Sequence, residues 1–301
     1  MTAYRGRFAP TPSGPLHFGS LVAALGSCLD ARAHGGAWLL RMEDVDPPRV
    51  VPGAADAILR SLEAYGFEWD DRVMWQSRRA EAYQAALDRL VRAGRVYGCA
   101  CTRKSLAEGA ARGVEGFVYP GTCRGRPPRP GMAQRLLVPP ARVVFLDGLL
   151  GRVACDVARE CGDFVLCRAD GVFTYQLAVV VDDAEQGITH VVRGADLLAS
   201  TPRQLVLQEA LGYFQPAYMH LPVALDREGF KLSKQTLAAP LDDGNPLPAL
   251  GRAAAFLGMR MGPVGSVAEF WDRARKVWPS TTLRPLRARR FASLSPADQR
   301  A

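Results

Sequence analysis

The stretch that decides the fold is RFAPTPSGPLHFGS, residues 7–20. Its first three residues are typical of a short strand, which Pro10 and Pro12 end. The turn that follows has the chemistry of a helix start, so we expect a helix to begin beside His17. A helix N-terminus attracts anions, a histidine there can contact phosphate, and Gly19 would let a base approach the backbone closely. The alternative is a plain turn before a core helix, with His17 bonded to the backbone.

The residues that follow alternate between helix-like and strand-like segments. These segments are a helix from Leu21 that ends at Gly35-Gly36, an apolar run at 37–42, and helices near 54–65 and 80–93. The apolar run is of the kind found in buried parallel strands, and the helices have apolar side chains at helical spacing. Strand and helix in alternation predict the α/β class with a doubly wound parallel sheet.

The chain from about Tyr97 to Tyr175 differs, because it is rich in proline, glycine and arginine. It contains short strand-like runs at 135–138, 142–146 and 164–168, and the hairpin-turn dipeptide Asp170-Gly171. The alternation then returns, with strands predicted at 188–193 and 221–225, a helix capped by Ser200 that ends at Leu211, and helices at 250–257 and 267–277. We interpret the middle segment as an insertion between two halves of the sheet.

Composition excludes several classes of protein. The 301 residues are 48% hydrophobic and 23% charged, which is unlike collagen, a disordered chain or a disulfide-stapled miniprotein. A formal charge of +8 favours an anionic partner, nucleic acid first. No apolar stretch approaches the ~18 residues of a membrane helix, and no secretory signal begins the chain, so we expect no membrane association. Seven unevenly spaced cysteines favour reduced thiols in the cytoplasm.

Two further clusters could carry chemistry. Lys231 and Lys234 are three residues apart on a predicted loop, where two mobile cations can reach a triphosphate; a solvated loop is the alternative. Cys99, Cys101 and Cys123 can supply three thiolates to a zinc ion, or remain unliganded thiols. No histidine lies between His34 and His190 to serve as a fourth ligand. The remaining cysteines are interpreted as core or surface thiols rather than a second site: Cys28, Cys155, Cys161 and Cys167.

Together these motifs resemble the two signatures of the class I aminoacyl-tRNA synthetases, the HIGH and KMSKS motifs. They read HFGS at 17–20 and KLSKQ at 231–235. Further blocks, at 7–14, 41–47, 174–183 and 192–197, resemble the glutamyl-tRNA synthetase catalytic core. The resemblance implies a Rossmann-type parallel sheet split by a zinc-bearing insertion. It implies four units: residues 1–96 and 175–228 as the halves of the catalytic domain, 97–174 as an acceptor-binding-like insertion, and 229–301 as the KMSKS-like loop and a short helical appendage.

The same resemblance implies roles for individual residues. Arg7 and Arg193 would hold the carboxylates of glutamate, and Glu43 its ammonium; a buried Arg193–Glu43 ion pair is the alternative. The other residues implied to bind glutamate are Phe8, Ala9, Pro10, Thr11 and Tyr175. His17, Lys231 and Lys234 would be catalytic. ATP, escorted by Mg²⁺, would contact His17, Gly19 and Lys234.

The resemblance also completes the metal site and suggests an RNA surface. Tyr119 would be the fourth ligand of a structural zinc ion, beside Cys99, Cys101 and Cys123. Basic residues near this site would track tRNA phosphates: Arg103, Lys104, Arg112, Arg124, Arg126 and Arg129. The cluster at Arg284–Arg290 is a weaker candidate and is otherwise a frayed tail.

The chain departs from the full-length enzymes in ways that narrow the family. Ser20 and Gln235 replace the last residues of the two motifs, and residues 236–301 are too few for a large anticodon-binding region, so we expect none. These features resemble the glutamyl-Q tRNA(Asp) synthetase family, which activates glutamate and transfers it to queuosine at the wobble position of tRNA(Asp). We expect a monomer. The alternatives are a short glutamyl-tRNA synthetase that charges a tRNA 3′ end, and a catalytically silent paralogue that binds tRNA or glutamate.

Overall fold

The structure is a computed structural model, and it describes residues 3–107, 110–113, 116–140, 142–225, 239–278, 283 and 288–290. Three parallel strands form the first half of the sheet in the order β1 (Arg5–Phe8), β2 (Ala37–Met42) and β3 (Asp70–Trp75). β2 coincides with the predicted apolar run, and five of its six residues are buried. The helices and 3₁₀ turns of this half are α1 (Phe18–Ala33), η1 (Pro47–Arg49), α2 (Ala54–Ala64), η2 (Gln76–Arg78) and α3 (Ala80–Arg92).

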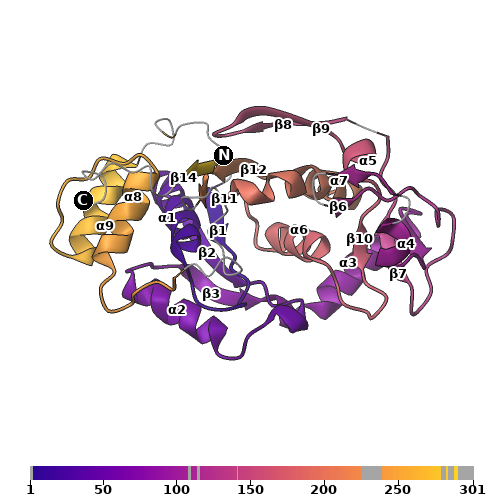
Figure 1. Ribbon diagram of the computed structural model, residues 1–301, viewed down its shortest axis with the longest axis horizontal. Helices are drawn as coiled ribbons and strands as arrows, with labels where there is room; N and C mark the ends of the chain where they lie inside the picture. Colours follow the sequence, from indigo (N-terminus) through magenta and orange to yellow (C-terminus); the bar gives the residue numbers. More distant parts are fainter. Residues whose placement is uncertain are drawn as a thin grey trace.

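The second half of the sheet begins with β11 (His190–Gly194), which lies beside β1 (Figure 1). The backbone N–H of Thr189 donates to the carbonyl of Arg5 at 2.9 Å, so the two halves join through their first strands. β11 pairs in parallel with β12 (Ala217–Leu221). The helices of this half are α6 (Tyr175–Glu185) and α7 (Thr201–Leu211). The predicted doubly wound arrangement of strands and helices is therefore confirmed.

The prediction of one continuous strand at 221–225 was wrong, because these residues belong to two strands. Pro222 has no N–H to donate to a sheet, and the pairing changes at this residue. β12 ends at Leu221, and β13 (Val223–Leu225) pairs with a different strand, β14 (Ala288–Arg290). Because β14 is a paired strand, the part of the Arg284–Arg290 cluster that the structure describes is not a frayed tail.

Ser200 occupies the N-cap position of α7, as predicted, but its side chain does not cap the helix. A 3₁₀ helix, η3 (Ala195–Ser200), runs directly into α7, so Ser200 has helical angles (φ −77°, ψ −27°) and its side chain makes no capping bond. Its hydroxyl instead accepts a hydrogen bond from Gln176 Nε2 at 3.1 Å. Pro202 still occupies the first turn, where its missing N–H costs nothing.

The middle segment adds strands of a different kind. An antiparallel sheet has the order β10 (Val165–Cys167), β7 (Ala133–Leu136) and β4 (Val96–Cys99). The hairpin of β8 (Arg142–Asp147) and β9 (Gly151–Asp156) instead extends the sheet of β11 and β12, because β8 pairs with β12. The short elements of this segment are α4 (Arg103–Ala107), β5 (Arg112–Gly113), β6 (Gly116–Phe117) and α5 (Val157–Glu160).

The last helices, α8 (Leu247–Phe256) and α9 (Val267–Val277), pack with α1 in the core of the first half (Figure 1). Trp278 Nε1 donates to Asp30 Oδ1 at 3.2 Å, and Tyr4 donates to the other oxygen of that carboxylate at 2.5 Å. Asp30 is buried, so both bonds satisfy a charge that water does not reach. Of the helices in the described ranges, not one has the length and apolarity that crossing a bilayer requires.

Candidate active site

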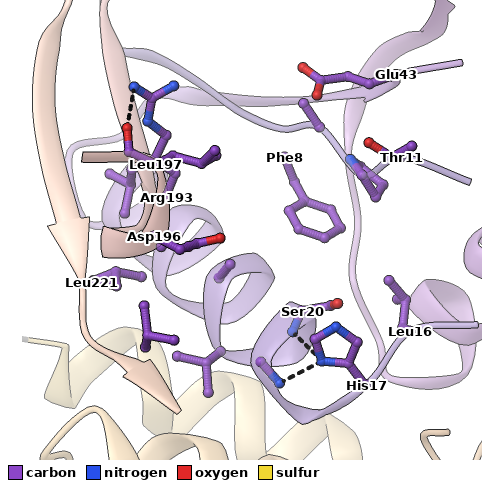
Figure 2. Close-up of a pocket in the computed structure, with 18 of the residues that line it drawn as sticks. Phe8, Thr11, Leu16, His17, Ser20, Glu43, Arg193, Asp196, Leu197 and Leu221 are labelled. Atoms are coloured by element: carbon purple, nitrogen blue, oxygen red, sulfur yellow. Dashed lines mark hydrogen bonds between the residues drawn. The ribbon is translucent and has the colours of Figure 1, made fainter. Parts of the chain in front are cut away.

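A cavity of about 490 Å³ opens at the carboxyl ends of β1, β2, β11 and β12, where α/β sheets place ligands (Figure 2). It is lined by every predicted glutamate- and ATP-binding residue that the structure describes: Arg7, Phe8, Ala9, Pro10, Thr11, His17, Gly19, Glu43, Tyr175 and Arg193. Lys231 and Lys234 lie outside the described residues. The structure thus brings together side chains from positions as far apart as 7 and 193.

His17 is the N-cap residue of α1. Its Nδ1 accepts hydrogen bonds from the backbone N–H groups of Gly19 at 3.1 Å and Ser20 at 3.4 Å (Figure 2). An Nδ1 that accepts leaves the proton on Nε2, so the neutral ring has a donor on its other edge. The bond to backbone expected in the plain alternative is therefore present, and it also fixes the tautomer of a histidine that lines the cavity.

Arg7 is held by a carboxylate that the sequence analysis did not single out. Its Nε and one terminal nitrogen donate to Asp183 at 3.2 and 3.4 Å. Arg41 donates to the same carboxylate at 2.7 Å. Burial opposes ionisation of Asp183, but the two guanidinium groups outweigh it and hold the pKa of this carboxyl below its ordinary value. Asp183 is therefore a fixed anion that orients Arg7.

Glu43 follows directly after β2 and is buried. Its backbone N–H donates to the carbonyl of Pro10 at 3.0 Å, which places it beside the loop after β1. Burial raises the pKa of its carboxyl to about 7, although Arg41 and Arg7 lower it. Among the described residues, Arg41 is the one cation within 4 Å of Glu43, at 3.6 Å. The alternative of an Arg193–Glu43 ion pair is therefore wrong.

Arg193 is held by neutral groups instead. Its guanidinium donates to His220 Nε2 (3.2 Å), the Tyr175 hydroxyl (3.2 Å), the Thr201 hydroxyl (2.8 Å) and the carbonyl of Leu197 (3.4 Å). Arg193 is 4% exposed, and in the part of the chain that the structure describes it has no acidic partner within 4 Å. A buried cation without a counter-ion is costly, and it gains most from an anionic ligand.

The sequence analysis missed several residues that hold this site. Asp182 and Asp183 lie in the last turn of the apolar helix α6. Arg41 interrupts the apolar strand β2, and His220 stands between Met219 and Leu221 in β12. In each case a charged or polar residue in an otherwise apolar segment could have revealed the interaction, because such residues are rarely buried without a partner.

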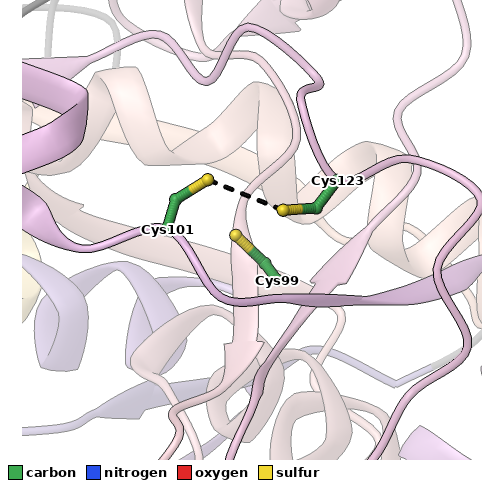
Figure 3. Close-up of side chains that lie close together, drawn as sticks. All are labelled: Cys99, Cys101 and Cys123. Atoms are coloured by element: carbon green, nitrogen blue, oxygen red, sulfur yellow. Dashed lines mark hydrogen bonds between the residues drawn. The ribbon is translucent and has the colours of Figure 1, made fainter.

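The three cysteines Cys99, Cys101 and Cys123 form a second cluster (Figure 3), and none of them lines the cavity. Their sulfur atoms all lie within 4.8 Å of one another, and those of Cys101 and Cys123 are 3.6 Å apart. The Tyr119 hydroxyl lies 3.4 Å from the sulfur of Cys99 and 3.5 Å from that of Cys101. Three sulfur atoms and one hydroxyl oxygen at these spacings can hold a metal ion. The other cysteines have no such grouping among the described residues, and Cys28 is buried in the core.

Most of the predicted RNA-binding residues lie on the surface. Lys104, Arg112, Arg126 and Arg129 are exposed. Arg124 is also exposed, but two of its N–H groups already donate to the two oxygens of Asp163, at 2.7 and 2.9 Å. The side chain of Arg103 lies outside the described part of the structure.

Comparisons with known proteins agree with this fold and site. The family model for the catalytic domain of class I tRNA synthetases (E and Q) matches residues 3–116 and 132–251. The glutamate–tRNA synthetase of Elizabethkingia anophelis superposes with a TM-score of 0.79 at 26% identity, over 99% of this chain and 69% of that one. A glutamate tRNA ligase of Elizabethkingia meningosepticum, solved with its amino acid, gives the same score and identity and is covered to 68%. The fold is that of a class I tRNA synthetase catalytic domain, which confirms the prediction of an enzyme of the ligase type.

Curated relatives show which family within the class I tRNA synthetases this chain belongs to. The chain is 58% identical over 282 residues to the glutamyl-Q tRNA(Asp) synthetase of Dechloromonas aromatica, covering 91% of this chain and 94% of the relative. It is 57% identical over 278 residues to that of Chromobacterium violaceum, covering 91% and 93%. The chain therefore belongs to the glutamyl-Q tRNA(Asp) synthetase family, as the sequence motifs predicted.

Proposed function

We propose that the protein activates L-glutamate with ATP to glutamyl-adenylate and then transfers the glutamate to the queuosine base at the wobble position of tRNA(Asp). The meeting of Arg7, Glu43 and Arg193 in one cavity is the observation that supports this most. Glutamate has two carboxylates and one ammonium, so a pocket with two cations and one acid matches its charges. The names of the curated relatives support tRNA(Asp) as the acceptor.

The two arginines would bind the carboxylates differently. Arginine has five N–H groups. Two of those of Arg7 donate to Asp183, which leaves three for a ligand and permits two-point binding. Four of those of Arg193 donate to protein acceptors, which leaves one. We therefore propose that Arg7 binds one carboxylate with two hydrogen bonds and that Arg193 binds the other with one. Glu43 would pair with the ammonium, and Phe8–Thr11 and Tyr175 would enclose the side chain.

Activation needs positioning and charge stabilisation rather than a protein nucleophile. A carboxylate oxygen of glutamate attacks the α-phosphorus of ATP, the new P–O bond forms, and the bond to pyrophosphate breaks. The Nε2–H of His17 and the N-terminus of α1 would stabilise the phosphates, with Gly19 allowing the nucleotide to lie close. Lys231 and Lys234 would add positive charge, and Mg²⁺ would arrive with ATP and neutralise phosphate charge. A queuosine hydroxyl would then displace AMP and form the ester.

The cysteine cluster suits a structural zinc ion. In a tetrahedral site with Zn–S bonds of ~2.3 Å, neighbouring sulfurs lie roughly 3.8 Å apart, close to the 3.6 Å between those of Cys101 and Cys123. We propose Cys99, Cys101, Cys123 and the Tyr119 hydroxyl as the ligands. The ion would tie together the start and the end of residues 99–123. The unit boundaries at 96/97, 174/175 and 228/229 are likewise part of this proposal.

The acceptor can be tested by offering labelled glutamate and ATP together with three RNAs: tRNA(Asp) with queuosine, the same tRNA without queuosine, and tRNA(Glu). We expect label on the first alone. Label on the 3′ end of tRNA(Glu) would make the protein a short glutamyl-tRNA synthetase. No label on any RNA, with no glutamate-dependent pyrophosphate exchange, would make it a silent paralogue.

A further inference from the structure

A line of three buried side chains leads from β8 to the cavity. Asp147 Oδ2 lies 2.6 Å from His220 Nδ1, and His220 Nε2 accepts from Arg193 Nε at 3.2 Å. The side chains of Asp147 and His220 have no exposed surface, and Arg193 is 4% exposed. They come from β8, β12 and β11, three neighbouring strands of one sheet. Arg193 and His220 are paired in register on β11 and β12.

The hydrogen bonds define one protonation state for His220. Arg193 Nε has only a hydrogen to offer, so His220 Nε2 must be the acceptor and Nδ1 must carry the proton toward Asp147. Burial lowers the pKa of His220; the bond to Asp147 opposes this shift, and the charge of Arg193 adds to it. The ring is therefore neutral, and the carboxylate selects its tautomer.

Asp147 is itself held in one orientation. Its Oδ1 accepts from the backbone N–H groups of Leu149 (3.0 Å), Leu150 (2.8 Å) and His220 (3.3 Å). Burial opposes its ionisation, but the bonds from His220 and from these backbone groups keep its pKa below the ordinary value. The β8–β9 hairpin thus presents a fixed anion to the histidine.

We propose that His220, with its tautomer fixed by Asp147, is a positioning residue that orients the Arg193 guanidinium for the substrate carboxylate. Arg193 has a single N–H left for a ligand, so the direction of that one bond depends on how the rest of the group is held. Thr201, Tyr175 and the carbonyl of Leu197 hold the terminal nitrogens, and among the described residues His220 alone holds Nε. This inference rests on the proposed binding of glutamate in the cavity, and it adds two residues that do not line it.

Two substitutions test this chain of hydrogen bonds from Asp147 through His220 to Arg193, which we call the relay. Each substitution removes a different bond of the chain. Asp147→Asn keeps the shape but turns an amide N–H₂ toward His220 Nδ1, which drives the proton to Nε2 and against Arg193. His220→Gln keeps a carbonyl that can accept from Arg193 Nε but loses the bond to Asp147. The matched control is Ser27→Ala, which removes a buried hydrogen bond from Trp38 Nε1 at a residue that does not line the cavity.

The readouts are the Kd for L-glutamate by titration calorimetry, the KM values for glutamate and ATP in pyrophosphate exchange, and the melting temperature. We expect Asp147→Asn to raise the Kd and KM for glutamate by about 10-fold or more, because it leaves the Arg193 Nε–H without an acceptor. The KM for ATP should not change. His220→Gln should show a smaller rise, and Ser27→Ala none.

A lower melting temperature with an unchanged glutamate Kd in both variants would overturn the relay and leave only a structural bond. If Asp147→Asn does not fold, His220→Gln decides the question by the same comparison. Wild-type protein that binds no glutamate would overturn both the relay and the proposed function. Wild-type protein that binds glutamate as tightly as both variants do would overturn the relay alone.

Discussion

The carboxylate of Glu43 lies 3.6 Å from the guanidinium of Arg41, two residues earlier in the chain, and both groups are buried. Arg41 is shared, because it also donates to Asp183 at 2.7 Å and lies 4.0 Å from Asp182. One fully buried arginine thus faces three acids. Arg41 attracts the closer carboxylate of Asp183 most strongly and stabilises the charge of Glu43 less. The pKa of Glu43 therefore stays near 7, where its carboxyl can gain or lose a proton.

Glu43 should make both stability and glutamate binding depend on pH. Burial raises its pKa from 4.5 to about 7, so between these values the folded protein keeps a proton that the unfolded chain releases. Stability should therefore fall as pH rises from about 4.5 to 7, by about 3 kcal/mol in all, and stay level above. Glutamate affinity should rise over the upper part of this range, because an ionised Glu43 attracts the ammonium. Denaturant unfolding at pH 5.5 and 8 measures the first effect.

The matched variant is Glu43→Gln, which keeps the volume and removes the titration. Its unfolding free energy should lose this part of the pH dependence, and it should lose glutamate activation at all pH values. An identical pH dependence in wild type and variant would assign the effect to another group.

His17→Asn should separate the two roles of His17. Asparagine is a good N-cap, so the unfolding free energy should change by less than about 1 kcal/mol. The variant lacks the Nε2–H donor, and pyrophosphate exchange should fall by about 100-fold or more if that donor stabilises the phosphates. His17→Ala should lose both the cap and the activity. Full exchange by the asparagine variant would contradict a phosphate contact.

Cys123→Ser should remove the metal ion. Elemental analysis of protein purified without chelator should find one zinc per chain in the wild type and much less in the variant, with a lower melting temperature. Cys155→Ser is the control, because Cys155 is half-buried and outside the cluster. Wild-type protein without zinc would reject the site.

Lys234→Ala should abolish glutamate-dependent pyrophosphate exchange, since this lysine is proposed to stabilise the phosphates as they separate. Lys276→Ala removes an exposed lysine from α9 and should leave exchange unchanged. The same exchange rate in both variants would sink the role given to Lys234.

The sequence predicted those parts of the fold that have a strong local pattern. The apolar run at 37–42 is strand β2, and the amphipathic segment at 80–93 is α3 within a residue. β3 escaped notice because its sequence, DDRVMW, starts with charged residues and not one of its six residues is fully buried. β9 has the same difficulty, because most of its residues are only half-buried on a hairpin.

The residues of the candidate site likewise differ in whether a local sequence pattern reveals them. Its lining residues lie in motifs, so they could be named from the sequence alone. Asp147 and His220 could not, because 73 positions separate them and only the pairing of β8 with β12 brings them together. Ser200 shows a partial success: its N-cap position was predicted, but the preceding 3₁₀ turn gives it helical backbone angles, and its side chain makes no capping bond.

The burial of Asp30 between Tyr4 and Trp278 has a consequence for synthesis on the ribosome. Chains grow from the N-terminus at ~5–20 residues per second, so Asp30 emerges long before Trp278 does. Until then the nascent chain lacks the two last helices of its first core and exposes the apolar face of α1 that they cover. We therefore expect the N-terminal half to depend on chaperones during translation and to acquire protease resistance only when nearly the whole chain has left the exit tunnel.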